Sequence, residues 1–173
     1  MAEGYRETRA DAQDVATEAS RKAYTVRKRR MAALAFADVP TLEAAAARLS
    51  DSFSYTFLRR PEAGLVMLEG RAGNSGQRFN LGEMLVTRCV VRLAAQSGSA
   101  TEGYAFIQGN HPRHAELAAI FDALLQQEEW SVALERSLIR PLVAKRAAIL
   151  RQRALETAAT MVDFFTLVRG EDA

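Results

Sequence analysis

The sequence has one cysteine, two histidines, one tryptophan and four prolines among its 173 residues. The single cysteine, Cys89, excludes an internal disulfide and fits a reducing compartment. No apolar run reaches the roughly 20 residues that a helix needs to cross a bilayer. The N-terminal segment is polar and lacks the apolar stretch of a secretory signal. These absences predict a cytoplasmic protein that makes no membrane contact.

Familiar catalytic motifs are also absent. "GRAGNSG" lacks the Gly-Lys-Ser/Thr ending of a phosphate-binding loop, and no Gly-x-Ser-x-Gly elbow occurs. Cys89 has no histidine adjacent in sequence, which favours an inert core residue over a nucleophile. No motif indicates a bound cofactor, and nothing assembles a nucleophile, a base and an oxyanion donor. The residues by themselves therefore favour an interaction subunit.

Hydrophobic residues make up 49% of the chain, which at this length predicts one globular domain with a core of its own. Residues 1–20 lack apolar periodicity, so we predict a flexible tail or a frayed helix there. The domain is expected to span residues 21–173.

A dense basic cluster, "RKAYTVRKRR", spans residues 21–30, although the net charge is only +2. The cluster is either a phosphate-binding surface for nucleic acid or the solvated face of a helix whose other face carries Val26, Met31 and Leu34. Proteins that bind single strands alternate several aromatic side chains with their cations, and this segment does not. The helix face is therefore favoured, and nucleic acid is not a favoured partner.

The sequence pattern changes from helical to strand periodicity and back, which predicts an α+β fold. A helix is expected at about 22–37, and a second one restarts at Pro40 and ends at "RRPEAG". Residues 64–71, 76–93 and 103–109 have strand patterns with short polar connections. They predict an antiparallel meander of about four strands, packed with the N-terminal helices.

Helical spacing returns after Gly109, with Asn110 as the expected cap and Pro112 in the first turn. The buried face is expected to contain Leu117, Ile120, Phe121, Leu124 and Leu125. A long C-terminal helical stretch follows at about 131–168, and Pro141 should kink or divide it. Because this stretch is too long for a domain of this size, we expect part of it to pack on another chain. A homodimer of the isolated protein is one such arrangement.

The strand at 76–93 contains charged residues among apolar ones. Met84, Val86, Arg88, Val90 and Arg92 share one face, and Leu85, Thr87, Cys89, Val91 and Leu93 share the other. Arg88 needs a counter-charge, because burying a lone guanidinium costs several kcal/mol. A cross-strand pair with Glu69 is the favoured interpretation. The alternative is that a partner subunit or an anionic ligand supplies the counter-charge.

A second polar cluster, "GNHPRHAEL", lies at the start of the helix after Gly109. Arg113 and His114 fall in the first turn, where free backbone N–H groups attract anions. The alternative is a surface pair between Arg113 and Glu116. A metal site built on His111, His114 and Glu116 is not favoured, because the chain has no further histidine.

Several of these stretches resemble the PhnG family, a subunit of the bacterial carbon–phosphorus lyase machinery. They are the basic helix "VRKRRMAALA", "RRPEAGLVMLEGRAGNSGQRFNLGEMLVTRCVVRL", "GYAFIQGNHPRHAELAAIFDALLQ" and "VDFFTLVRGED". The likeness covers about Val26–Asp172 and is specific through the order and spacing of "FNLGE", "TRC" and "HAE". It departs at "GNHPRHAE", where the family has a more basic turn.

The resemblance implies a role in phosphonate use: the step that joins a phosphonate to ATP, releases adenine and gives a ribose 1-phosphonate 5-triphosphate. It implies a complex in which the PhnI subunit resembles a nucleosidase, PhnJ performs radical cleavage, and PhnH is a further companion. Two alternatives remain open. The chain is an enzyme in its own right, using Arg88, His114 and Glu83, or it is a nucleic-acid-binding module.

The resemblance also suggests candidate contact residues, with no catalytic residue assigned and no metal ligand among them. Candidate anion or partner contacts are Asn80, Glu83, Arg88, Arg113, His114 and Glu116. Candidate subunit contacts near the C-terminus are Phe164, Phe165 and Arg169.

Overall fold

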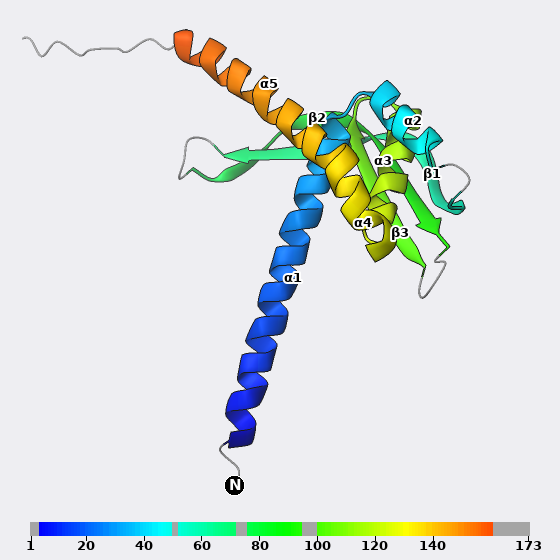
Figure 1. The fold of residues 1–173 in the computed structure, drawn as a ribbon. Coiled ribbons are helices and arrows are strands. Elements are labelled where there is room, and N and C mark those ends of the chain that lie inside the picture. The colour runs from blue at the N-terminus through cyan, green and yellow to red at the C-terminus, as the bar shows by residue number, and fades with distance from the viewer. Residues whose placement is uncertain (1–3, 50–51, 72–75, 95–99, 161–173) are drawn as a thin grey trace, which may run out of the picture.

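The computed structural model describes residues 4–49, 52–71, 76–94 and 100–160, and these form an α+β fold (Figure 1). Its single sheet is antiparallel with the order β1-β2-β3. The strands are β1 (Tyr55–Arg71), β2 (Arg78–Leu93) and β3 (Thr101–Gln108). The helices are α1 (Gly4–Phe36), α2 (Val39–Ala47), α3 (Pro112–Leu124), α4 (Glu128–Leu134) and α5 (Arg140–Ala159).

The predicted meander is confirmed, but within the described residues it has three strands rather than about four. β1 is longer than expected, because Pro61 lies inside it rather than ending a helix before it. The pairing of β1 with β2 shifts register on either side of Arg59, so Pro61 falls in an irregular stretch. A proline is tolerated there because β1 is at the sheet edge and its missing N–H breaks no ladder on the outer side.

α1 ends at Phe36, close to the predicted end, but begins at Gly4, within the segment expected to be a flexible tail or a frayed helix. Its N-terminal part extends away from the rest of the fold (Figure 1). Among residues 20–36 of this helix, the buried side chains are Ala33 and Leu34, close to its C-terminal end. The flexibility of residues 1–20 remains a prediction.

The core lies between α3 and one face of the sheet. β2 contributes Thr87, Cys89, Val91 and Leu93 to this face, all of them buried, as the alternation of the strand predicts. The predicted apolar face of α3 is buried against them. Gly103 of β3 marks the closest approach, since a Cβ built there would lie 1.9 Å from the backbone oxygen of Ala119.

The start of α3 differs from the prediction. The N-cap is His111 rather than Asn110, and it makes no side-chain capping hydrogen bond. Instead, the buried hydroxyl of Thr87 accepts the His111 N–H at 2.8 Å and donates to the Gly109 carbonyl at 2.6 Å. Thr87, a residue of the neighbouring strand, thus pairs with backbone groups at the start of α3. In an isolated helix, an N-cap side chain of the same segment would do this.

The C-terminal helical stretch is divided, as Pro141 predicts. A π-helical turn at Glu135–Ile139 separates α4 from α5, and Pro141 lies in the first turn of α5. Pro141 has no N–H to donate to the preceding helical turn, which favours a change of helical pattern at this point. α5 projects away from the domain (Figure 1), and its residues 151–159 are all exposed. The predicted continuation to Val168 lies outside the described residues.

Asp38 is the N-cap of α2, and its carboxylate predicts a pH-dependent contribution to stability. It accepts the Thr41 N–H at 3.0 Å and a hydrogen bond from Lys145 at 2.7 Å. These contacts, with Lys145 first, hold the pKa of Asp38 well below its ordinary value. We expect Asp38→Ala to lower the free energy of unfolding by about 1 kcal/mol at neutral pH.

The difference should be present above the ordinary aspartate pKa of about 4 and shrink as the pH falls toward the lower pKa of the folded state. Urea unfolding at neutral and at strongly acidic pH measures it. An unchanged difference at the acidic pH would contradict this account.

Candidate functional site

The closed end of the β1–β2 hairpin projects past the helices, to the left in Figure 1. We call this projection, residues 64–71 with 78–85, the hairpin arm. Leu65 and Leu81 are each 62% exposed, although leucine is a core residue in most folds. The large apolar side chains exposed on the arm are Leu65, Met67, Leu68, Phe79, Leu81 and Leu85.

Part of the arm continues the face that forms the core. Leu85 shares a strand face with Thr87 and Cys89, which are buried in the core, and Leu65 is its direct cross-strand neighbour. α3 packs on this face at Thr87 and beyond, whereas the same face is bare at Leu85. A contiguous apolar patch of this kind marks an interaction site.

Arg88 has a cross-strand partner, but the prediction that it pairs with Glu69 is wrong. Its Nη2 atom lies 3.1 Å from Oε1 of Glu62, and Glu69 instead pairs with Arg78. The register shifts around Arg59 place Glu62 directly opposite Arg88. The sequence does not reveal where these register shifts occur, and each shift changes the residue of β1 that lies opposite a given residue of β2. The partner of Arg88 could therefore not be predicted from strand alternation.

The pairing of Arg88 leaves positive charge and a hydrogen-bond donor unmatched. Arg59 also contacts Oε1 of Glu62, at 3.4 Å, so two guanidinium groups share one carboxylate oxygen. The Nε atom of Arg88 is buried and has no hydrogen-bond partner among the described residues. The guanidinium lies against Gly64, the first residue of the arm, where a Cβ would be 3.4 Å from Nη2.

The predicted anion site at the start of α3 is used within the fold. His114 is 7% exposed, and its Nε2 atom donates to the Leu34 carbonyl at 2.9 Å. Arg113 contacts Glu116 at 3.0 Å and Glu43 at 3.2 Å, which raises the pKa of Arg113. The alternative of a surface pair between Arg113 and Glu116 is therefore confirmed.

Glu116 also receives a hydrogen bond from the Tyr55 hydroxyl. Burial, and then this carboxylate, raise the pKa of Tyr55 to about 12. The tyrosine stays protonated and joins β1 to α3. The polar residues of this cluster thus connect α1, β1 and α3.

The basic cluster of α1 attaches this helix to the domain. Arg27 makes a bidentate pair with Asp122, at 2.7 and 3.2 Å, and the carboxylate raises the pKa of Arg27. Arg30 donates to Glu135, to the Leu125 carbonyl and to Ser131. Arg29 also pairs with Glu135. A helix face is confirmed, but these arginines bind α3, α4 and the π-helical turn rather than solvent alone.

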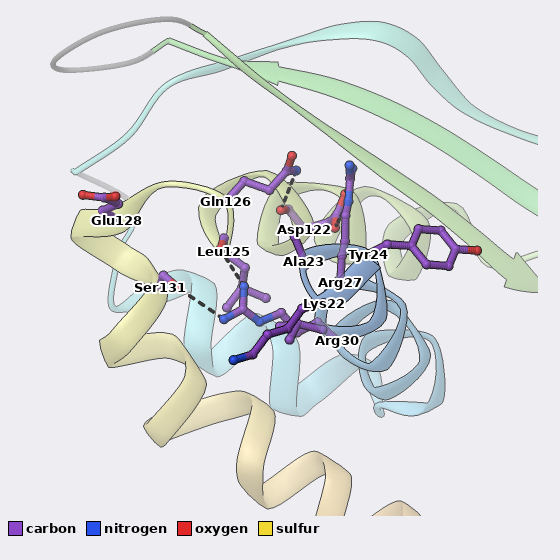
Figure 2. Close-up of a pocket in the computed structure, with 11 residues that line it drawn as sticks. Lys22, Ala23, Tyr24, Arg27, Arg30, Asp122, Leu125, Gln126, Glu128 and Ser131 are labelled. Atoms are coloured by element: carbon purple, nitrogen blue, oxygen red, sulfur yellow. Dashed lines mark hydrogen bonds and ion pairs between the residues drawn. The ribbon is translucent and has the colours of Figure 1, made fainter. Parts of the chain in front are cut away.

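A groove of about 710 Å³ lies along this junction, between α1 and the α3–α4 connection (Figure 2). Arg27 and Arg30 enter it from α1, and Asp122, Gln126 and Ser131 face them. Sequence analysis missed Asp122. The available signal was an acidic residue inside the apolar segment "AAIFDALL", which is typical of a buried, paired carboxylate.

The structure does not bring all the predicted contact residues together. Asn80 and Glu83 are exposed on the hairpin arm, whereas Arg113, His114 and Glu116 belong to α3. Asn80 lies opposite Glu69, and Glu83 opposite Met67. Three further candidates lie outside the described residues: Phe164, Phe165 and Arg169.

Cys89 is fully buried, and burial raises the pKa of its thiol to about 11. A thiol in this state is a poor nucleophile at neutral pH. The described part of the chain contains no group of three or more metal-ligating side chains. None of its helices is long and apolar enough to cross a membrane.

These features define a class of protein: an α+β chain with an exposed apolar hairpin arm, whose buried polar side chains mainly serve its own fold. The family described as phosphonate metabolism protein PhnG matches residues 25–170. A similar protein from Rhizobium meliloti (strain 1021) is 42% identical over 146 residues, which are 84% of this chain and 90% of the relative. It is named alpha-D-ribose 1-methylphosphonate 5-triphosphate synthase subunit PhnG. The chain belongs to the PhnG family of phosphonate metabolism proteins.

Proposed function

We propose that the chain is a subunit of an alpha-D-ribose 1-methylphosphonate 5-triphosphate synthase, as its relative is named. The complex joins a phosphonate to ATP, releases adenine and acts in organic phosphonate catabolism. The observation that carries this proposal is the bare apolar arm, because a monomer rarely leaves so many large apolar side chains in water. Family membership identifies the complex, and the arm supports a role within it.

The chain acts in this complex as a structural or positioning subunit. Of the groups that might perform chemistry, His114 is buried against Leu34 and the thiol of Cys89 is protonated. Bond breaking at the ribose therefore belongs to a partner of the PhnI type, which resembles a nucleosidase. PhnH- and PhnJ-type subunits complete the proposed assembly.

The two alternative functions have less support. A self-sufficient enzyme would need His114 to reach substrate, but its side chain is enclosed between α3 and α1. A nucleic-acid-binding surface would need free cations, but Arg27 pairs with Asp122, and both Arg30 and the exposed Arg29 pair with Glu135. A cytoplasmic location and a homodimer of the isolated chain remain predictions.

The purified chain is expected to release no adenine from ATP in the presence of methylphosphonate. The mixture with PhnI-, PhnH- and PhnJ-type subunits of the same organism should release it, and omission of this chain should stop the release. Chromatographic detection of adenine measures both. Release by the chain alone, or undiminished release without it, would reject the proposal.

A further inference from the structure

We propose that the hairpin arm and Arg88 form one docking surface, clasped by a partner subunit that contributes apolar side chains to the arm and a carboxylate to Arg88. The inference rests on the proposed function and specifies where and by what chemistry the partner binds. The guanidinium of Arg88 lies against Gly64 at the base of the arm, on the face that continues to Leu68 and opposite the face of Leu65 and Leu85.

The apolar part requires a covering layer. The arm is a two-stranded ribbon beyond the reach of β3, which pairs with β2 only from Val86 to Leu93. Two-stranded hairpins are marginally stable in water unless something packs on them. Covering the six exposed side chains removes on the order of several hundred Å² of apolar surface from water, a substantial part of a specific interface.

The arm exposes apolar side chains on both of its faces. Leu65 and Leu85 oppose each other on the strand face that α3 covers further along. Leu68 and Leu81 lie on the opposite face, the one from which Arg88 projects, because Leu81 meets the Cβ position of Gly70 and Arg88 meets that of Gly64. The partner therefore clasps the arm from both faces: one of its elements lies beside α3, and another brings the carboxylate to Arg88.

The charged part identifies the polar group of the partner. Arg59 and Arg88 share one oxygen of Glu62, which leaves an excess positive charge, and Nε of Arg88 lacks an acceptor. A carboxylate binds a guanidinium most strongly through two parallel hydrogen bonds, which commonly include Nε. An aspartate or glutamate of the partner, toward which Arg88 turns, supplies both the charge and the acceptor.

A small anion or a second copy of the chain fits this surface less well. An anion would match the charge of Arg88 but leave the apolar side chains of the arm in water. A second copy would bring the same excess positive charge to the interface, where like charges repel. A partner subunit with an acidic group satisfies both parts of the surface.

The first test concerns the arm. The full chain carrying Leu65→Glu and Leu81→Glu is co-expressed with the PhnI-, PhnH- and PhnJ-type subunits and purified through a tag on this chain. We expect about tenfold less partner to be retained than with the unchanged chain, because a charge at each position is buried on docking. The control is Val132→Glu on α4, where the side chain is 68% exposed and off the arm.

Both arm side chains are exposed, so thermal unfolding of the isolated variant should match that of the unchanged chain. Equal retention of the partners by the arm variant and the control would overturn the docking surface. If the unchanged chain itself retains no partner, the proposed function fails instead, so the two failures are distinguishable.

The second test concerns the carboxylate. The variant Arg88→Lys, Glu62→Gln is assembled with its partner subunits. The lysine supplies an amine that can be cross-linked, and the glutamine removes the carboxylate of this chain that would otherwise react with it. A zero-length carbodiimide should join position 88 to an aspartate or glutamate of a partner subunit, as peptide mapping by mass spectrometry would show. The control is Arg113→Lys, where cross-links should stay within the chain, to Glu43 or Glu116.

Three results would overturn this part of the proposal. The first is the absence of any cross-link from position 88 to a partner in the assembled complex. The second is a cross-link only between two copies of this chain. The third is Arg88-dependent binding of ATP or methylphosphonate by the isolated chain, measured by calorimetry. The last two would assign the arginine to self-association or to a small anion.

Discussion

Adding one methyl group at position 103 is expected to destabilise this protein strongly. A Cβ at Gly103 would lie 1.9 Å from the Ala119 oxygen and 2.8 Å from both the Cβ and the backbone nitrogen of Ala123. Two of these three atoms belong to the backbone of α3, so no side-chain rotation relieves the clash. We expect Gly103→Ala to lower the free energy of unfolding by about 3 kcal/mol or more, since α3 must move off the sheet.

The matched control is Gly64→Ala on β1. A Cβ there would be 3.4 Å from the Arg88 guanidinium, which is an ordinary contact with a flexible side chain. Gly64→Ala should change the free energy of unfolding by no more than about 1 kcal/mol. Alanine lowers the conformational entropy of the unfolded chain, and this gain offsets the cost of a small shift of the Arg88 side chain. Urea unfolding followed by circular dichroism compares the two variants. Similar stabilities would show that the packing of α3 on β3 adapts far more easily than the geometry indicates.

Removal of the Asp122 carboxylate should be the other strongly destabilising change. The side chain is buried, accepts two hydrogen bonds from Arg27, and accepts the backbone N–H of Tyr104 at 3.0 Å. Asp122→Ala therefore leaves a guanidinium and an amide without their acceptor. Breaking a buried pair from one side typically costs about 3–5 kcal/mol, and we expect a loss at the lower end because Arg27 is partly exposed.

A double-mutant cycle with Arg27→Met separates the ion pair from the contact to Tyr104. If the pair dominates, the double variant should be less destabilised than the sum of the single variants. Glu69→Ala is the control, because its pair with Arg78 is exposed and should contribute about 1 kcal/mol or less. Equal losses for Asp122→Ala and Glu69→Ala would refute the anchoring role of Asp122.

Periodicity predicted the elements whose structure depends on local pattern and burial. The buried face of α3 and the core face of β2 follow directly from the spacing of their apolar residues. The division of the C-terminal stretch follows from Pro141, since proline cannot donate to the helical turn before it. These predictions succeeded because each depends on residues that are close together in sequence.

The failures involve contacts between distant segments. The Glu62–Arg88 pair depends on irregularities in β1 that change the cross-strand register. The replacement of the Asn110 cap depends on Thr87, which is 24 residues before His111, the residue whose N–H it accepts. Arg27 and Asp122 are 95 residues apart, so no local pattern shows that the basic cluster anchors a helix. The sequence shows that the arm is rich in apolar residues. It does not show that their side chains are exposed, because this depends on where the helices cover the sheet.

The contacts of Asp122 and its neighbour Gln126 have a further consequence for the outer edge of β3. Asp122 accepts the Tyr104 N–H, and Gln126 donates to the Glu102 carbonyl at 2.8 Å. Another strand would need these two backbone groups in order to add to the sheet. Side chains from α3 therefore close this part of the edge to strand addition, which limits fibre-like growth through β3 before a partner has bound.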